Sequence, residues 1–185
     1  MIAALTGVPG TGKSSVAAEL RGRGFEVVDL HDLVERKGLW DHEDAERGSK
    51  IVDPRVLSEF LQPALREARA RRQPIVLEGH LAHLVKGVEV AVVLRCHPAK
   101  VAERLRARGW VEAKVRENAQ AEALDAITIE AAEEVRDVLE VDTSARAAGE
   151  TAALVAALLA TPSPEAWTAH RAGTISWGEE VLAWS

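Results

Sequence analysis

The sequence predicts an α/β fold, a three-layer α/β/α sandwich built around a five-stranded parallel sheet. Short apolar runs alternate with amphipathic helical segments along most of the 185 residues, which is typical of parallel crossover units. A glycine-rich loop joins the first apolar run directly to the first helical segment. The chain has no internal repeat and no low-complexity tract, so a layered enzyme-like domain is favoured over a repeat architecture.

The first unit runs from a strand at Met1 to Leu5 into a helix at Ser15 to Leu20. Its connection, Gly7-Val8-Pro9-Gly10-Thr11-Gly12-Lys13-Ser14, fits the phosphate-binding pattern G-x-x-x-x-G-K-[ST]. Glycines let successive main-chain N–H groups turn toward one anion at the positive end of the helix. In such loops the lysine reaches the outer phosphates of a nucleoside triphosphate and the hydroxyl ligates Mg²⁺. Lys13 and Ser14 are the residues expected to do so here.

Length and composition favour one globular domain, with 47% hydrophobic and 28% charged residues. The net charge of -6 gives no overall attraction for nucleic acid, although local basic clusters leave contact with RNA open. Cys96 is the only cysteine, which excludes an internal disulfide and suits a reducing compartment. No apolar run approaches the roughly 20 residues of a membrane span. We expect a cytoplasmic protein without a signal peptide.

The second strand, Phe25 to Asp29, ends in carboxylates. Asp29 lies where ligands bind in parallel sheets, but either Asp29 or Asp32 could instead cap the following helix. From Leu33 to Ile51 the chain is polar and lacks strand periodicity, which favours a mobile segment that faces the substrate. Trp40 within it could stack on a base or anchor the segment.

A helix is expected to begin at Asp53-Pro54 and to continue to Ala70. Its apolar stripe is predicted at Val56, Phe60, Leu61 and Leu65.

The next strand, Ile75 to Glu78, ends in a carboxylate of the kind that holds Mg²⁺ in phosphate-loop enzymes. Two positions further on, His80 could orient water or a phosphate, or could be a polar residue that begins a loop. His80 and His83 have a spacing that can chelate a metal on a helix. No third ligand is evident, so a zinc site is disfavoured.

A strand from Glu89 to Leu94 precedes a helix that opens at His97-Pro98. Arginines are dense here, and guanidinium groups suit phosphate oxygens, but not all of these arginines can belong to one site. They are Arg95, Arg104, Arg106 and Arg108.

The C-terminal part is predicted to contain a long helix from Val111 to Glu134, a fifth strand from Val138 to Val141 and a helix from Glu150 to Ala160. Residues 161–164 form a proline-rich boundary. Three tryptophans follow and are interpreted as anchors on the body, with partner docking as the alternative. These are Trp167, Trp177 and Trp184.

The chain resembles small nucleoside-monophosphate kinases, and more closely the adenylate kinase isoenzyme 6 type family with its archaeal adenylate kinase relatives. The resemblance covers about residues 1 to 160. The Glu-x-His pair and the Arg-Gly-aromatic segment are more particular to this family than the phosphate loop is. The matching features are the phosphate loop, Glu78-Gly79-His80, Leu94-Arg95, Arg104-Leu105, Arg108-Gly109-Trp110 and Glu117-Asn118-Ala119-Gln120-Ala121-Glu122.

The resemblance implies an ATP site, a monophosphate-binding flap from Asp29 to about Val52 and a lid from Arg108 to about Asn118. It places Arg108 on a nucleotide phosphate and Arg146 near the adenine. It implies Glu78 as a Mg²⁺ ligand together with Ser14, although some relatives carry Asp in place of Glu78. The residues it assigns to ATP are Gly10, Gly12, Lys13, Ser14 and Ser15.

The same resemblance implies the reaction ATP + AMP = 2 ADP, accompanied by ATP hydrolysis in which His80 or Glu78 aligns water. It also implies a part in small ribosomal subunit maturation, with a ribosomal protein or the pre-ribosomal subunit as partner. Two alternatives remain: an ATPase switch, and a kinase of another small acceptor. For a hydroxyl acceptor, Asp29 or Asp32 would be the base.

Overall fold

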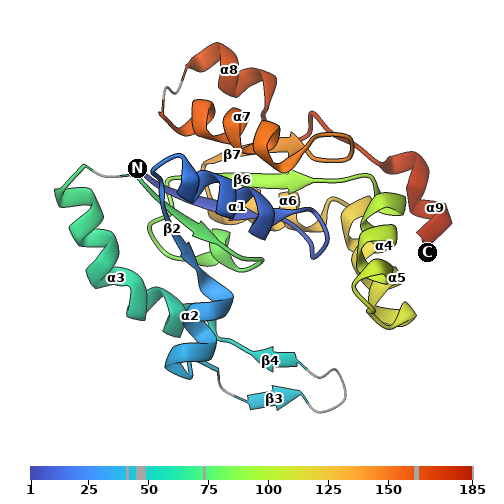
Figure 1. The fold of residues 1–185 in the computed structure, drawn as a ribbon, viewed down its shortest axis with the longest axis horizontal. Coiled ribbons are helices and arrows are strands. Elements are labelled where there is room, and N and C mark those ends of the chain that lie inside the picture. Colours follow the sequence, from blue (N-terminus) through green and yellow to red (C-terminus); the bar gives the residue numbers. More distant parts are fainter. Residues whose placement is uncertain (41, 45–48, 73, 161–162, 185) are drawn as a thin grey trace.

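The main sheet has five parallel strands in the order β2-β5-β1-β6-β7, as seen in the computed structural model (Figure 1). The structure describes residues 1–40, 42–44, 49–72, 74–160 and 163–184. The predicted five-stranded parallel sheet is confirmed. Its strands are β1 (Ile2–Thr6), β2 (Glu26–Asp29), β5 (Ile75–Glu78), β6 (Val90–Arg95) and β7 (Asp137–Asp142).

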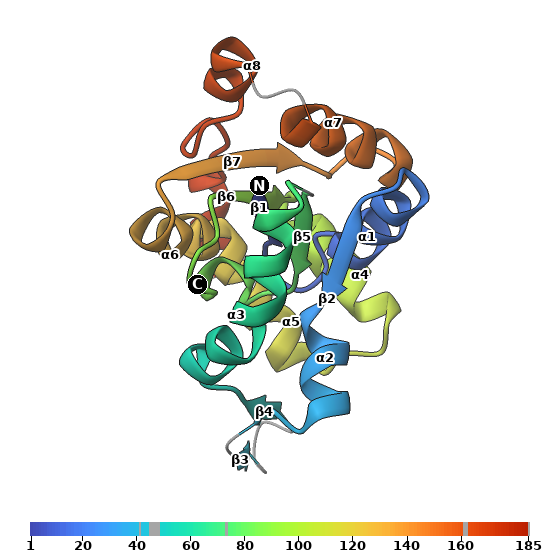
Figure 2. The same cartoon turned by 90° about the vertical axis from the view of Figure 1, so that its left-hand side faces the viewer.

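Helices cover both faces of the sheet, which confirms the three-layer architecture. Figure 2 shows one group of helices on either side of the strands. The first face packs against α1 (Lys13–Gly22) and α7 (Ala148–Ala160), which bury side chains such as Leu20 and Val155. The second packs against α3 and α6, whose buried residues include Leu65 and Ala131. Their bounds are Pro54–Ala70 for α3 and Ala126–Glu134 for α6.

The parallel register gathers polar strand ends at one edge of the sheet. Asp29 at the end of β2 pairs with Glu78 at the end of β5, and Leu5 of β1 pairs with the same glutamate. The phosphate loop begins at Gly7, directly after the last residue of β1. Ligands bind at this carboxyl edge in open α/β sheets. The fold therefore places the loop, Asp29 and Glu78 side by side.

The segment from Leu33 to Ile51 is more regular than predicted. It contains α2 (Leu30–Lys37) and an antiparallel hairpin of β3 (His42–Asp44) and β4 (Ser49–Ile51). The expectation of irregular structure was wrong because α2 is short and only its Leu30, Leu33 and Val34 are buried, too few for a clear helical period. Trp40 packs partly buried against the core, as the anchoring interpretation requires. Residues 41 and 45–48 lie outside the described part of the chain.

Helix α3 begins where predicted, but its buried stripe is displaced. The carboxylate of Asp53 accepts a hydrogen bond from Arg55 N at 2.8 Å, and Pro54 is the first helical residue. Leu61 and Leu65 are buried as expected, together with Leu57. Val56 and Phe60, however, are 41% and 43% exposed. The stripe was assigned one residue too early at its first turn.

The predicted helix from Val111 to Glu134 is two helices, α5 (Glu112–Ala123) and α6. The chain breaks at Asp125, which has a left-handed backbone with φ of 55°. This conformation is tolerated by aspartate and cannot continue an α-helix. The carboxylate of Asp125 binds the guanidinium of Arg95, so a tertiary contact holds the break in place.

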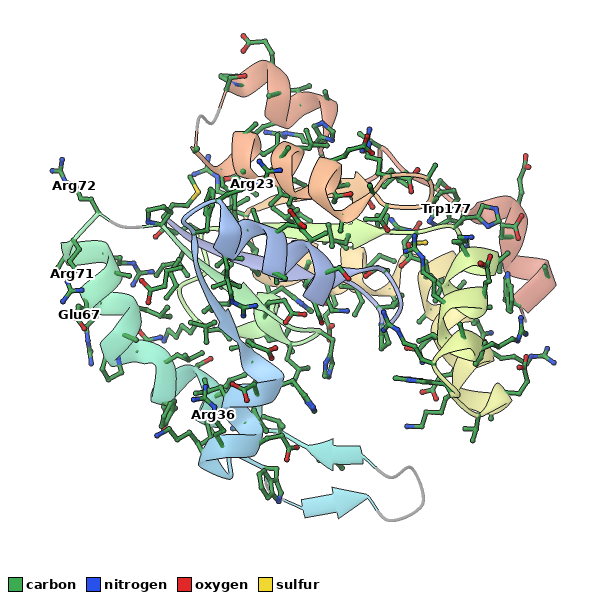
Figure 3. All side chains as sticks on the ribbon, in the orientation of Figure 1. Arg23, Arg36, Glu67, Arg71, Arg72 and Trp177 are labelled. Carbon is green, nitrogen blue, oxygen red and sulfur yellow. The ribbon has the colours of Figure 1, made fainter. Side chains whose placement is uncertain are left out.

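The C-terminal segment runs along the free edge of β7. It contains α8 (Pro164–Ala169), the short turn η2 (Gly178–Glu180) and α9 (Val181–Trp184). The indole N–H of Trp167 donates to Leu158 O at 3.0 Å, and Ala172 N donates to Val138 O in β7. Trp177 reaches the far end of the molecule beside α4 (Pro98–Ala107), as Figure 3 shows. Within the described chain, no helix has both the length and the hydropathy of a membrane span.

Candidate active site

Glycines give the phosphate loop a shape that other residues cannot adopt. Gly7 has φ of 137°, and a Cβ built there would lie 2.5 Å from Leu94 O on the neighbouring strand. Gly12 has φ of 96° and directly precedes α1, with open space where its Cβ would be. The loop is therefore pressed against β6 at its start and turns freely into the helix at its end.

The side chain of Lys13 folds back onto the phosphate loop. Its Nζ donates to Gly7 O at 2.8 Å and to Val8 O at 2.9 Å. Burial lowers the pKa of Lys13 from 10.5 to about 8, an effect opposed by Glu78 and Glu122 and reinforced by Arg108. The side chain is charged at neutral pH, in a partly dehydrated place where an anion gains most from it.

Ser14 and Glu78, the two residues expected to hold Mg²⁺, lie next to one another. The hydroxyl of Ser14 donates to Glu78 Oε1 at 3.3 Å, and Glu78 is only 4% exposed. Burial raises the pKa of Glu78, and the nearby charge of Asp29 raises it further while Lys13 opposes both. The hydroxyl of Ser14 and the carboxylate of Glu78 are hard oxygen donors, and Asp29 is a second acid nearby. They fit Mg²⁺, whose charge would relieve the repulsion between the acids.

Asp29 satisfies both interpretations left open by the sequence. Its Oδ1 accepts a hydrogen bond from Asp32 N at 3.0 Å and so caps α2. Asp29 also lines a cavity that the phosphate loop shares with α2. Asp32 instead pairs with Arg36 at 2.8 Å on the exposed side of α2 and does not line that cavity.

The side chains of His80 and His83 lie in different surroundings. His80 lines the cavity, and burial lowers its pKa with help from the positive charges of Lys13 and His31. His83 lies in the turn η1 (Ala82–Leu84) and points inward, bonding Thr6 Oγ1 at 3.1 Å and Glu130 at 2.8 Å. Both ring nitrogens of His83 are therefore engaged, by Thr6 and by Glu130. Across the described chain, no group of three or more His, Cys, Asp or Glu side chains is placed to hold a metal ion.

The four arginines have four different positions. Arg108 lines the cavity at the C-terminal end of α4. Arg104 donates to Gly10 O at 3.2 Å and to Thr143 O at 2.9 Å, so it braces the loop from behind. Arg106 pairs with Glu112 at the surface. Of the four, Arg108 is the one that faces the cavity.

Arg95 is a structural charge. It is 1% exposed and binds Glu122 at 2.7 Å as well as Asp125 and Glu140. Burial opposes its charge, but these acids raise the pKa of the guanidinium overall. The C-terminal segment completes this network: Gly173 N donates to Glu140 Oε2 and the indole of Trp177 to Glu122 Oε1. Trp177 therefore anchors the segment on α5.

Three further predicted residues belong to the loop or lie outside the cavity. Gly10 lines it, and the built Cβ of this glycine would lie 3.2 Å from Val101 of α4. Ser15 follows Ser14 in the first turn of α1 and is exposed. Arg146 follows β7, is exposed, and donates to Asp142 O at 3.3 Å. Neither Ser15 nor Arg146 lines the cavity.

The cavity has a volume of about 580 Å³ and lies between two arms of the molecule. In Figure 1, α2 and the hairpin lie on one side of the loop between β1 and α1, and α4 with α5 lies on the other. Volumes of this size suit small-molecule ligands. Its walls come from five residues of the phosphate loop, from α2 and the residue before it, from the region of Val52 and Leu57, from the end of β5, and from the end of α4. They are Pro9, Gly10, Gly12, Lys13, Ser14, Asp29, Leu30, His31, Val34, Glu35, Val52, Leu57, Glu78, Gly79, His80, Leu81, Arg108 and Trp110.

Some supporting residues escaped the sequence analysis. Thr143 Oγ1 donates to Thr11 O at 2.8 Å, and Thr11 Oγ1 donates to Val8 O at 3.0 Å. Together with Arg104 they lock the loop to the end of β7. The position of Thr143 directly after a strand was the available signal, but its partner lies 132 residues away. Of the wall residues that were missed, Glu35 lies in the polar segment from Leu33 to Ile51, and His31 lies between Asp29 and that segment.

The arrangement and the comparisons that follow define a class of protein: a phosphate-loop nucleotide kinase, in which the phosphate loop opens onto a cavity that it shares with α2 and α3. The family model described as AAA domain matches residues 4–125. A shikimate kinase from Acinetobacter baumannii, solved with shikimate, has a similar fold (TM-score 0.56, 17% identity, 88% of this chain and 94% of that one).

Relatives narrow the class. A protein of Archaeoglobus fulgidus named "Putative adenylate kinase" is 42% identical over 182 residues, covering 98% of this chain and 94% of the relative. A protein of Pyrococcus abyssi with the same name is 37% identical over 180 residues, covering 97% and 92%. The chain belongs to this archaeal-type adenylate kinase family within the AAA-domain proteins, and it is a nucleotide kinase.

Proposed function

We propose that the protein transfers a phosphoryl group from ATP to AMP, forming two ADP. The observation that carries this proposal is the common cavity, in which Lys13, Ser14 and Glu78 face the acceptor walls of α2 and α3. A triphosphate on the loop would point its terminal phosphate into that cavity. The names of the relatives support adenylate as the acceptor.

Lys13 and the main-chain amides of the loop, with Gly10, Gly12, Ser14 and Ser15, would hold the phosphates of ATP. An oxygen of the AMP phosphate forms the new bond to the γ-phosphorus, and the bond from that phosphorus to the β,γ-bridging oxygen breaks to release ADP. The acceptor is already an anion, so no general base is required. Lys13 and Arg108 would offset the charge that both nucleotides bring.

Mg²⁺ would be held by Ser14 and Glu78, and when bound it neutralises phosphate charge. The remaining site roles are part of the same proposal. Arg146 would lie near the adenine of ATP. The flap from Asp29 to about Val52 and the lid from Arg108 to about Asn118 would close over the substrates. The region from 161 to 185 would be an extension of the kinase domain.

An accompanying ATPase activity would use water in place of AMP, and His80 or Glu78 would align that water. The lowered pKa of His80 keeps its imidazole neutral near pH 7, which allows it to accept a hydrogen bond. A role in small ribosomal subunit maturation, with a ribosomal partner, rests on the family resemblance alone. A cytoplasmic location rests on the single cysteine.

A second candidate function is phosphorylation of a hydroxyl-bearing acceptor. The observation that favours it is Asp29, which lines the acceptor wall beside Glu78 and could take a proton from a hydroxyl. Asp32 faces away on α2 and is excluded as the base.

The test is an acceptor panel. Protein with Mg·ATP is incubated with AMP, CMP, UMP, GMP or no acceptor, and ADP is measured. We expect AMP-dependent ADP formation well above the rate without acceptor. Equal rates with and without every monophosphate would overturn the kinase proposal and favour the ATPase switch. Asp29→Asn then separates the acceptor chemistries: a phosphate acceptor tolerates it, whereas a hydroxyl acceptor loses its base.

A further inference from the structure

Trp110 is a pocket residue for which the family comparison gives no role. It lines the 580 Å³ cavity together with Arg108, on the arm opposite α2. Its side chain is 39% exposed, so the core does not account for it. Among the described residues of the cavity wall, Trp110 is the one tryptophan, and phenylalanine is absent from that wall.

The backbone fixes Trp110 and Arg108 relative to one another. Helix α4 ends in a Schellman motif, in which Trp110 N donates to Leu105 O at 3.2 Å and Gly109 N to Arg106 O at 2.9 Å. Gly109 supplies the left-handed turn with φ of 77°. This cap presents a guanidinium and, two residues later, an indole to the same cavity.

The opposite wall contributes four apolar side chains beside polar ones. Leu30 and Val34 come from α2, Leu57 comes from the first turn of α3, and Val52 lies two residues before that helix. The polar residues of the same wall are Asp29, His31 and Glu35. The phosphate of an acceptor must lie near the loop, because attacking and leaving oxygens are in line across the transferred phosphorus. The other end of the acceptor then reaches toward these four apolar side chains, which suit the face of a planar base.

We propose that Trp110 stacks on the nucleobase of the acceptor and thereby selects a nucleotide over a smaller phosphate ester. The indole covers one face of the base, and the four apolar side chains of the opposite wall cover the other. Arg146 lies outside this cavity, so the adenine expected beside it belongs to ATP, and Trp110 serves the second nucleotide. The inference rests on the proposed reaction with AMP.

Kinetics of Trp110→Ala test the inference. Stacking of a base on an aromatic side chain corresponds to roughly a 5- to 150-fold change in affinity. We expect KM for AMP to rise by about that factor, with kcat at saturating AMP and KM for ATP changed by less than about twofold. Trp110→Phe keeps an aromatic face and should restore most of the affinity. Ile129→Ala is the matched control, because Ile129 is an exposed apolar residue of α6 that lies outside the lid and does not line the cavity.

Fluorescence gives a reading without catalysis. AMP added without ATP should quench the tryptophan emission of the wild type, and the quench should be lost in Trp110→Phe. Ribose 5-phosphate, which lacks a base, should not quench either protein. A purely structural role would lower the melting temperature of Trp110→Ala and change both KM values together.

The outcomes separate the two proposals. If the wild type forms ADP from AMP but Trp110→Ala keeps its KM for AMP, stacking is refuted and the kinase assignment stands. If the wild type forms no ADP from AMP, the proposed reaction fails and the inference fails with it. A rise confined to KM for AMP, together with loss of the quench, supports both.

Discussion

Gly7→Ala and Gly12→Ala form a matched pair that tests how the phosphate loop is held. Both glycines have positive φ, so alanine is strained by about 1–3 kcal/mol at either position. Only at Gly7 does the added Cβ also collide, with Leu94 O at 2.5 Å and Thr11 Oγ1 at 2.9 Å. Leu94 O belongs to β6, an interior strand of the sheet, and cannot move aside without a large cost.

Overpacking of this kind adds about 1–3 kcal/mol to the loss of stability. For a chain of this size, each kcal/mol lowers the melting temperature by roughly 2–4 °C. Gly7→Ala should therefore melt about 2–12 °C below Gly12→Ala. Urea unfolding followed by circular dichroism measures the difference in the free energy of unfolding, provided that the slope m is the same for both. If Gly7→Ala is as stable as Gly12→Ala, the loop does not press against β6 as described.

Three further predictions concern charges. Lys13→Met should lower ADP formation roughly 10²–10³-fold, while Lys37→Met on the exposed side of α2 should not; a loss of less than tenfold would contradict the role of Lys13. Burial lowers the folded-state pKa of Lys13 to about 8, so kcat/KM for ATP should fall as pH rises through 8. The free energy of unfolding should rise between pH 8 and 10.5, because in that range the unfolded chain binds a proton that the folded chain has lost. This rise in the free energy of unfolding should disappear in Lys13→Met. Glu140→Gln should destabilise by roughly 3–5 kcal/mol because Glu140 is buried against Arg95, whereas the exposed Glu179→Gln should be neutral; equal melting temperatures would show that the network is not structural.

Local sequence patterns predicted those features that depend on residues close together in the chain. The phosphate loop, the parallel strands and the Asp53-Pro54 helix start follow from residue types at fixed spacing, and each is where the sequence predicted. The contact of Ser14 with Glu78 also follows, because adjacent parallel strands end at the same edge of the sheet.

Features that depend on contacts between residues far apart in the chain could not be predicted from the sequence. The break at Asp125 depends on the carboxylate binding Arg95, which lies thirty residues away in the chain. Arg95 was one of four arginines considered for phosphate contact from the sequence. In the structure it binds three acids, which come from α5, the α5–α6 junction and β7. The brace formed by Thr143 and Arg104 has the same origin. Such pairs have no local signature.

The central claim is that the cavity joins a triphosphate grip to a site for AMP. Its most direct test follows the label from ATP carrying a radioactive γ-phosphate, with AMP present and Mg²⁺ added. We expect the label to appear in ADP, and Lys13→Met to slow the transfer roughly 10²–10³-fold. Label found only in inorganic phosphate, at a rate that AMP does not change, would contradict it.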